Sequence, residues 1–423
     1  MKYNKAVIGG HFVISFDNVI NGFLAVVMAP LFFGSSNDPI VQLLSSYAAY
    51  AALFVTGPVG ALTFGRMGDK FGRKNALLVS IMGIGLPVFA IGILPTYSTI
   101  GVAAPIILII LRMLQGFFKG AEYSGVLIHN HETGNKRVSS SANVISLGCF
   151  GGCAAAVVCW CATQSEYVNW SWRIPFTIGG MLAFVVFFFR MRIPETDDYI
   201  EILNQQRVSR SPIKELVSHH KLETLVGIVI CAMYMAFAYS SMIFGNRLFQ
   251  QAGYSVSQSM LFSVFDMLWI SISISICGKV ADKIGMVRQM QIGSLVLMAA
   301  SYPLCMLIDG ELTLFKIYTY MIFVTFLSAS IASCSAAYVL HLLPAHCRYT
   351  GFALSDSLGA IIGGATPLMM LLFSSIFKTN LGCALWFYIM TIPTFVLITL
   401  MNRRIKDKSI QPEIKGKNTV DMG

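Results

Sequence analysis

Four polar side chains recur at helical spacing inside one long apolar run of the sequence. The intervals between them are three, four and three residues, which places them on one face of an α-helix; they are Arg112, Gln115, Lys119 and Glu122. Ionised side chains in such a run are costly, usually face the interior of a helix bundle and mark a functional site by default. The alternative is a Lys119–Glu122 pair that only holds helices together.

A carboxylate beside cations inside an apolar bundle can take up and release a proton. Glu122 is predicted to do so because it is flanked by Lys119, with Arg112 within reach. Asp17, in an earlier apolar run, is the second candidate.

The remaining polar residues of these runs are candidates for binding a solute. Arg112, Gln115 and Lys119 suit a carboxylate, which an arginine engages through two parallel hydrogen bonds. Asp266 and Asp356 lie inside later apolar runs and favour an amine. A zwitterion would satisfy both sets.

A charged, glycine-rich stretch predicts a gate. Residues 65–74 read GRMGDKFGRK, and we expect them to form a short hairpin between two apolar runs. Its candidate residues are Gly65, Gly68, Asp69, Gly72 and Arg73, with the glycines permitting close helix approach and a tight turn. A loop that merely follows the distribution of positive charge is the alternative.

A weaker copy of this stretch, at residues 278–285, centres on Asp282 and suggests two related halves. Met286 and Val287 replace Arg73 and Lys74 there, so the charged gate is predicted mainly in the first half. When the two halves meet, Asp69 is expected to pair with a cation or with the N-terminus of the eleventh helix, whose dipole favours anions. Arg348 lies close to that end in sequence.

The composition indicates which elements position these residues. The chain has 423 residues, 56% of them hydrophobic and 12% charged, which suits a bilayer better than a soluble fold. Runs of about 20 apolar residues can span a membrane, where helices satisfy their own backbone groups. We read twelve such runs: 6–33, 42–64, 75–94, 102–128, 138–163, 174–189, 222–249, 257–277, 289–308, 314–342, 349–377 and 381–401.

The charge pattern sets orientation and domain organisation. Lys and Arg gather in alternate connections, which places both termini in the cytoplasm, and the net charge of +10 is therefore mainly a topology signal. The dispersed positive charge argues against nucleic-acid binding. The predicted divisions are a six-helix bundle at 1–190, a cytoplasmic linker at 191–221, a second six-helix bundle at 222–402 and a cytoplasmic tail at 403–423.

Neither the cysteines nor the histidines predict a catalytic or metal site. The ten cysteines lie almost wholly in apolar runs and are expected to be reduced packing residues. His129 and His131 flank a run end beside Glu132, without a nucleophile or a metal pattern, and a solvated helix end explains them. An enzyme is not expected.

Several motifs resemble those of one transporter family. Arg112, Gln115, Gly116, Gly120, Glu122 and Gly125 match a signature of the fourth helix in the metabolite:proton symporters of the major facilitator superfamily, and the hairpin resembles that superfamily's loop between helices two and three. Residues 172–176 (WRIPF), 193–199 (IPETDDY) and 343–351 (LPAHCRYTG) are similar to further motifs of the family. The first helix departs from it, since only Asp17 of an acidic and aromatic motif remains.

The resemblance implies an all-α membrane protein with twelve transmembrane helices in two pseudo-symmetric six-helix bundles. It further implies uptake of a small organic metabolite with a proton, by alternating access, in a bacterial inner membrane. The proton would be the coupling ion, with no other cofactor, and the partners would be the solute and the bilayer, with the protein a monomer. Two alternatives stay open: proton-driven efflux of a small organic molecule or siderophore, and a non-transporting solute sensor.

Overall fold

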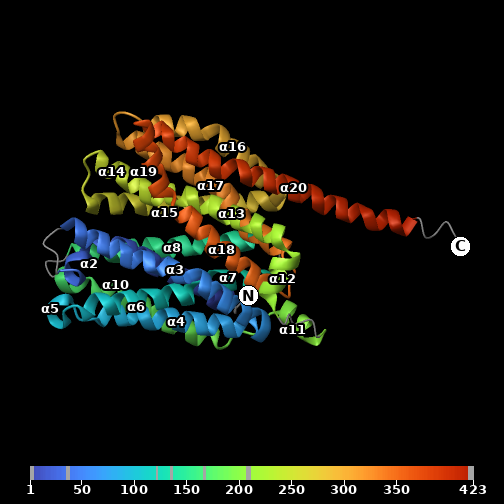
Figure 1. Ribbon diagram of the computed structural model, residues 1–423, viewed down its shortest axis with the longest axis horizontal. Helices are drawn as coiled ribbons and strands as arrows, with labels where there is room; N and C mark the ends of the chain where they lie inside the picture. Colours follow the sequence, from blue (N-terminus) through green and yellow to red (C-terminus); the bar gives the residue numbers. More distant parts are fainter. Residues whose placement is uncertain are drawn as a thin grey trace.

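The computed structural model describes residues 4–34, 39–120, 122–133, 137–164, 168–205 and 211–417. Long helices run side by side to form an elongated bundle, and the residues in these ranges form no β-strand (Figure 1). Ten segments of the described chain are long and apolar enough to cross a membrane. Two further passes, α1–α2 and α3, complete the twelve-helix fold that the sequence predicts.

The first six passes form one side of the molecule. The long helices are α1 (Asn4–Phe23) with α2 (Ala25–Phe32), α3 (Pro39–Phe71), α4 (Arg73–Ile93), α6 (Ala103–Lys119) with α7 (Glu122–Thr133), α8 (Val138–Thr163) and α10 (Arg173–Arg190). Two short helices, α5 (Tyr97–Ile100) and α9 (Val168–Ser171), lie in the connections at one end. The connection that follows α10 contains α11 (Asp197–Asn204) and α12 (Pro212–His219).

The last six passes form the other side. They are α13 (Lys221–Tyr239) continued by the π-helix η1 (Ser240–Phe244) and α14 (Gly245–Gln251), then α15 (Val256–Ile284), α16 (Met286–Leu307), α17 (Leu314–Leu342), α18 (Arg348–Gly364) with α19 (Thr366–Phe377), and α20 (Cys383–Lys417). A 3-10 turn, η2 (Asn380–Gly382), precedes α20.

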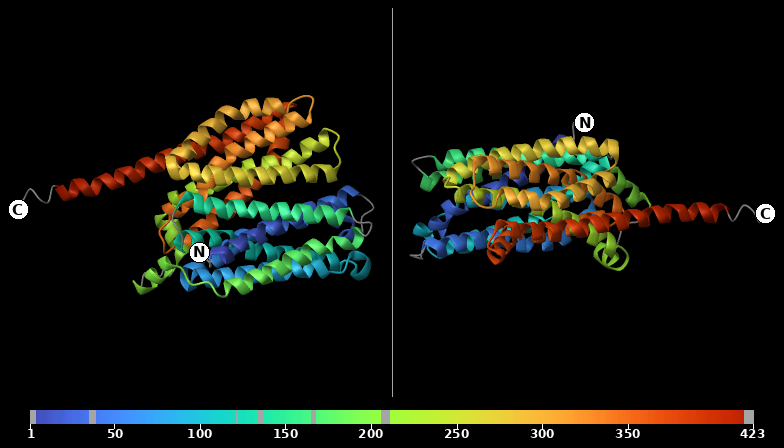
Figure 2. Two further views of the ribbon diagram at one scale, coloured as in Figure 1. Left: turned by 180° about the vertical axis from the view of Figure 1, so that it is seen from behind. Right: turned by 90° about the horizontal axis from the view of Figure 1, so that it is seen from above.

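The two sets of helices lie side by side, and two helix pairs join them. Figures 1 and 2 show the helices α1–α10 gathered on one side and most of the later helices on the other. Across this boundary α8 packs along α15, and α3 packs along α18. The helices α11 and α12 lie at the end of the bundle from which α20 projects (Figure 1).

The predicted hairpin at residues 65–74 is almost entirely helical. Helix α3 continues through Phe71 and α4 begins at Arg73, so the loop predicted there is wrong and reduces to Gly72. Gly72 has a φ of 103°, a conformation that favours glycine. Gly285 repeats this break between α15 and α16 with a φ of 90°, which confirms the internal repeat. We call the end of the bundle that carries both breaks the hairpin end.

Two passes are interrupted near the polar residues identified from the sequence. The seventh pass contains η1, a π-helix of the kind that is frequent at functional sites. The eleventh pass breaks between Gly364 and Thr366, next to Pro367, whose missing N–H suits the first turn of α19.

Candidate functional site

The centre of the first half contains a buried carboxylate with three hydrogen-bond donors. Asp17 on α1 has no exposed surface. Its Oδ2 accepts from Lys119 Nζ at 2.8 Å, and its Oδ1 accepts from Gln115 Nε2 at 3.1 Å and Asn21 Nδ2 at 3.2 Å. Lys119 Nζ also donates to Asn18 and keeps 10% of its side-chain surface exposed. The charge on Asp17 is therefore matched by a cation that is not fully enclosed.

Arg112 supports this group from one turn away. Its Nη1 donates to Gln115 Oε1 at 3.3 Å, and its guanidinium lies 5.3 Å from the centre of the Phe176 ring. The contact with Gln115 orients the amide whose other end donates to Asp17. Three of the four residues predicted to share a helix face thus act together: Gln115 and Lys119 donate to Asp17, and Arg112 donates to Gln115.

Glu122 does not join them, and the predicted neighbourhood of this residue is wrong. It contacts Ser80 on α4 and pairs with Arg190 at the end of α10, 2.5 Å from Nη1, with neither side chain of the ion pair exposed. The Lys119–Glu122 pair considered from the sequence does not form either. Each residue has a partner on another helix instead: Lys119 pairs with Asp17 on α1, and Glu122 contacts α4 and α10.

The sequence does not predict a role for Arg190, because it immediately follows an apolar run, at the boundary with the predicted cytoplasmic linker. Its Nη1 and Nη2 donate to the carbonyls of Leu77 and Val7, each at 3.0 Å. These contacts fix the guanidinium inside the first half. Its position directly after three phenylalanines, with no polar spacer, is the only sequence signal that could have indicated burial.

The two later acids lie apart from Asp17 and from each other. Asp266 on α15 accepts from Ser241 Oγ at 2.5 Å and Thr325 Oγ1 at 2.7 Å, and Thr325 also donates to Ser241. This closed group joins α15, η1 and α17 within the second half. Asp356 on α18 accepts one hydrogen bond, from Tyr234 Oη at 3.2 Å. The predicted solute-binding residues therefore fall into three separate groups.

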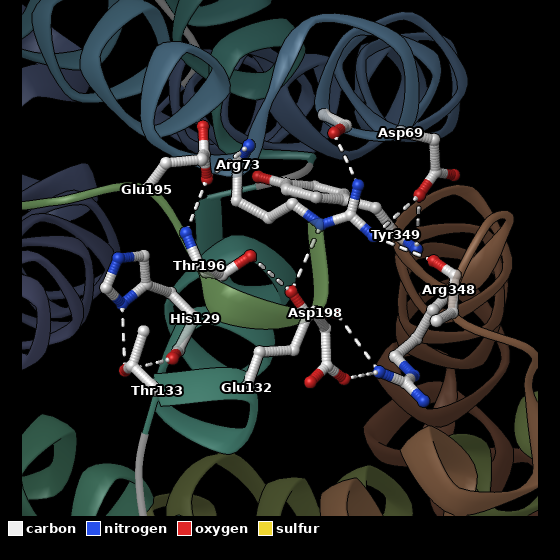
Figure 3. Close-up of polar contacts among 12 residues, drawn as sticks. Asp69, Arg73, His129, Glu132, Thr133, Glu195, Thr196, Asp198, Arg348 and Tyr349 are labelled. Atoms are coloured by element: carbon white, nitrogen blue, oxygen red, sulfur yellow. Dashed lines mark hydrogen bonds and ion pairs between the residues drawn. The ribbon is translucent and has the colours of Figure 1, made fainter. Parts of the chain in front are cut away.

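At the hairpin end, Asp69 binds the N-terminus of α18, as the sequence predicts. Its carboxylate accepts from the backbone N–H groups of Tyr349 at 3.1 Å and Thr350 at 2.9 Å, and from Thr350 Oγ1 at 2.7 Å (Figure 3). Asp69 is buried, and the first N–H groups of a helix have no partner within it. The contact joins the two halves through a full negative charge placed on the positive end of a helix dipole.

The repeat forms a matching contact in the opposite direction. Asp282 at the end of α15 accepts from the N–H groups of Val138 at 2.8 Å and Ser139 at 3.4 Å, at the N-terminus of α8. Each half thus extends one aspartate to a helix N-terminus of the other half. The copy was predicted to contribute little, but it forms this contact although Met286 and Val287 replace Arg73 and Lys74.

An ion cluster surrounds Arg73 in the first half (Figure 3). Glu132 bridges two arginines: Oε2 accepts from Arg73 Nε at 3.2 Å and Oε1 from Arg348 Nη1 at 3.1 Å. Arg348 Nη1 also pairs with Asp198 at 2.9 Å, and Arg73 Nη2 donates to the carbonyl of Ala345 at 2.7 Å. The predicted gating residues Arg73 and Arg348 therefore meet through a shared carboxylate.

Glu132 corrects the expectation of a solvated helix end, because it is 5% exposed. Its Oε2 also accepts from Thr196 Oγ1 at 2.7 Å. Glu195 accepts from the N–H groups of Arg73 at 3.0 Å and Lys74 at 3.2 Å, at the start of α4. Residues 193–199 were noted as a motif, but their contacts with α4 and α7 depend on the tertiary fold.

The glycines Gly65 and Gly68 bring α3 against α18. A Cβ added to Gly65 would lie 2.7 Å from Thr350 Cα, and one added to Gly68 would lie 2.3 Å from the Tyr349 ring. The glycines therefore place Asp69 within reach of α18 and do not form the predicted turn.

Removing Asp69 should release the N-terminus of α18. Hydrogen bonds to a charged group are worth about 1.5–3 kcal/mol each, so we expect amide exchange in the first turn of α18 to accelerate at least about tenfold in Asp69→Ala. Hydrogen exchange with mass spectrometry measures this. The preference among solutes should stay the same while transport slows.

The Asp282→Ala variant is the matched control, because it should accelerate exchange at the start of α8 instead. Unchanged exchange at the start of α18 in Asp69→Ala would contradict the assignment. A changed preference among solutes would contradict a role confined to gating.

Replacing Glu122 with Gln leaves Arg190 charged and unmatched in the core. Breaking a buried ion pair on one side costs about 3–5 kcal/mol, so the Tm of the purified variant should fall clearly. The double variant Glu122→Gln/Arg190→Gln removes both charges and should melt above the single one. A single variant that melts with the parent protein would show that the pair is not a stability element.

Comparison with known proteins agrees with the fold. The family model described as "Major Facilitator Superfamily" matches residues 9–367. The Proline/betaine transporter of Salmonella typhimurium is 27% identical over 391 residues, which cover 87% of this chain and 77% of the relative. The Citrate-proton symporter of Klebsiella pneumoniae is 25% identical over 379 residues, which cover 86% and 83%.

Among solved structures, the proton:xylose symporter XylE has a TM-score of 0.73 at 12% identity, and the match covers 94% of each chain. At that identity the likeness shows the fold alone. The family model and the arrangement of helices establish the family. The chain belongs to the Major Facilitator Superfamily of membrane transporters.

Proposed function

We propose that this protein carries a small zwitterionic solute together with a proton, by alternating access. The observation that supports this most directly is the Asp17–Lys119 ion pair at 2.8 Å, which lies between α1 and α6 in the interior of the first half. The relatives include proteins named as proline/betaine transporters and citrate-proton symporters, which supports both an organic solute and proton coupling.

The pair supplies a simple basis for coupling. While Asp17 is ionised, it holds the Lys119 ammonium and neutralises it. When Asp17 takes up a proton, Lys119 loses its counter-charge and can bind the carboxylate of a solute. Solute and proton then favour each other's binding, because each separates the same ion pair. The exposed tenth of the Lys119 side chain gives the solute a point of contact.

Asp17 suits this role better than Glu122, which reverses the order predicted from the sequence. Glu122 is fully buried and its partner Arg190 is fixed by two backbone carbonyls, so that pair has little freedom to open. Lys119 is instead a flexible side chain with a second acceptor, Asn18, that is exposed. Proton exchange needs a pair that can separate.

The distribution of charge favours a zwitterion over a tricarboxylate. Asp17 occupies the Lys119 cation, and Asp356 and Asp266 add buried acids in the second half. A multiply charged anion would be repelled by all three carboxylates. A zwitterion moved inward with one proton carries one positive charge and gains about 2.3 kcal/mol per 100 mV of membrane potential.

The contacts at the hairpin end support a gating role in this cycle. Asp69 and Asp282 cross between the halves in opposite directions and hold that end closed. We place it on the cytoplasmic side of a bacterial inner membrane, because the Lys and Arg residues gather in the connections on that side. Release of the two aspartates would then open the path to the cytoplasm.

The Asp17→Asn variant tests the coupling. Asn resembles the protonated acid and keeps an oxygen that can accept from Gln115 or Asn21. In proteoliposomes loaded to give an inward proton gradient, we expect accumulation of labelled glycine betaine to fall at least about tenfold, while exchange of external for internal betaine continues. The control is Asp309→Asn, which removes an acid at the opposite end of the bundle.

Full accumulation in Asp17→Asn would contradict coupling at this residue. Expulsion of betaine from vesicles along the same gradient would instead indicate the antiport alternative.

A further inference from the structure

One buried carboxylate has fewer hydrogen bonds and ion pairs than the others in the described part of the chain. Six carboxylates are buried in the described part of the chain. Four of them, Asp17, Asp69, Glu122 and Glu132, pair with a lysine or an arginine. The fifth, Asp266, accepts from two hydroxyl groups.

The sixth, Asp356, has one hydrogen bond among the described residues, from Tyr234 at 3.2 Å, and no ion pair there. A buried charge is costly unless it is paired and hydrogen-bonded. Asp356 keeps 9% of its surface exposed, so a partner from outside the chain can reach it. The missing partner of a carboxylate is a cation.

Tyrosines lie near the same carboxylate. Tyr234 on α13 donates to Asp356, Tyr239 follows on the same helix, and the phenol of Tyr123 on α7 lies beside that of Tyr234. The Tyr123 ring also lies 6.3 Å from that of Phe352, one turn before Asp356 on α18. Aromatic faces attract ammonium groups, most strongly where water is excluded. All three tyrosines are only partly buried.

Asp356 lies close to the end of α6, where Lys119 is the last residue. The next residue on α18, Ser357, donates to the carbonyl of Gly120 at 3.3 Å, and Gly120 directly follows Lys119. Tyr123 is the second residue of α7, which belongs to the same pass. Asp356 and Lys119 are thus each one residue away from a contact that crosses the boundary between the halves.

We infer that Asp356, with Tyr123, Tyr234 and Tyr239, binds the ammonium group of a zwitterionic solute, while Lys119 binds its carboxylate. This inference rests on the proposed function and adds the chemistry of the solute's positive end. The acid selects the positive charge, and the rings favour a substituted ammonium over a small hydrated ion. Because the groups come from both halves, a bound solute joins the two bundles.

The test compares two probes of the same shape. Glycine betaine and 3,3-dimethylbutanoate share a carboxylate and a trimethyl group, but only betaine carries the positive nitrogen. Binding to the full-length protein in nanodiscs is measured by calorimetry. The parent protein should bind betaine at least about tenfold more tightly than the butanoate, since an acid with aromatic rings stabilises a cation by about 1–2 kcal/mol or more.

The Asp356→Asn variant should lower betaine affinity to that of the butanoate and leave butanoate affinity unchanged, which also shows that the variant is folded. Asp309→Asn should keep the ratio of the parent protein. Tyr239→Leu, which retains the acid, should lower betaine affinity alone and gives a second test if Asp356→Asn does not fold.

An unchanged ratio in both Asp356→Asn and Tyr239→Leu overturns the inference. Equal binding of the two probes by the parent protein, or binding of citrate without betaine, overturns it as well. These results leave proton coupling at Asp17 standing, because gradient-driven uptake of citrate would still depend on Asp17. Conversely, the protein could discriminate between the probes through Asp356 while a proton gradient has no effect on betaine uptake. That result would contradict the proposed coupling and support the ammonium site.

Discussion

A carboxylate inside a membrane protein needs a hydrogen-bond donor or a cation, and this requirement determines which helices of this molecule are joined. Its low-dielectric interior strengthens each matched contact and makes an unmatched one costly. The partner of a buried acid therefore shows which two helices that acid holds together. Asp17 joins α1 to α6, Glu122 joins α7 to α10, and Asp69 joins α3 to α18.

The contacts differ in how readily they can separate. The Glu122–Arg190 pair lies within one half and is fixed by backbone carbonyls, which suits a permanent element of the bundle. Asp69 and Asp282 contact helix N-termini of the opposite half, where the loss of one contact leaves amides that water can satisfy. Alternating access requires such contacts between rigid units.

One helix connects the gate with the proposed solute site. Thr350, which binds Asp69, and Asp356 are separated by six residues of α18, or about 9 Å along the axis. Tyr349 on the same helix lies against Gly68 at the gate and, through its hydroxyl, against Gly125 on α7. A solute that draws Asp356 toward the first half would therefore act on the same rigid segment that closes the hairpin end.

The sequence predicts the helices better than it predicts which buried side chains pair with each other. Hydrophobic runs predict the passes, and the repeated glycine–aspartate motif predicts the contact of Asp69 with the eleventh helix. The partner of Glu122 was not predictable, because Arg190 lies on another helix, and regular spacing in the sequence indicates only neighbours on the same helix. The Arg73–Glu132–Arg348 cluster joins residues far apart in the chain, and no local pattern shows that Glu132 is buried.

The central claim is that proton uptake and solute binding both open the Asp17–Lys119 pair and so favour each other, and proton uptake on binding tests it most directly. Purified protein in weakly buffered solution containing a pH indicator would be titrated with glycine betaine. The account predicts that the parent protein takes up a proton as each betaine binds and that Asp17→Asn binds betaine without taking one up. Binding without proton uptake in the parent protein, or equal uptake in Asp17→Asn, would contradict it.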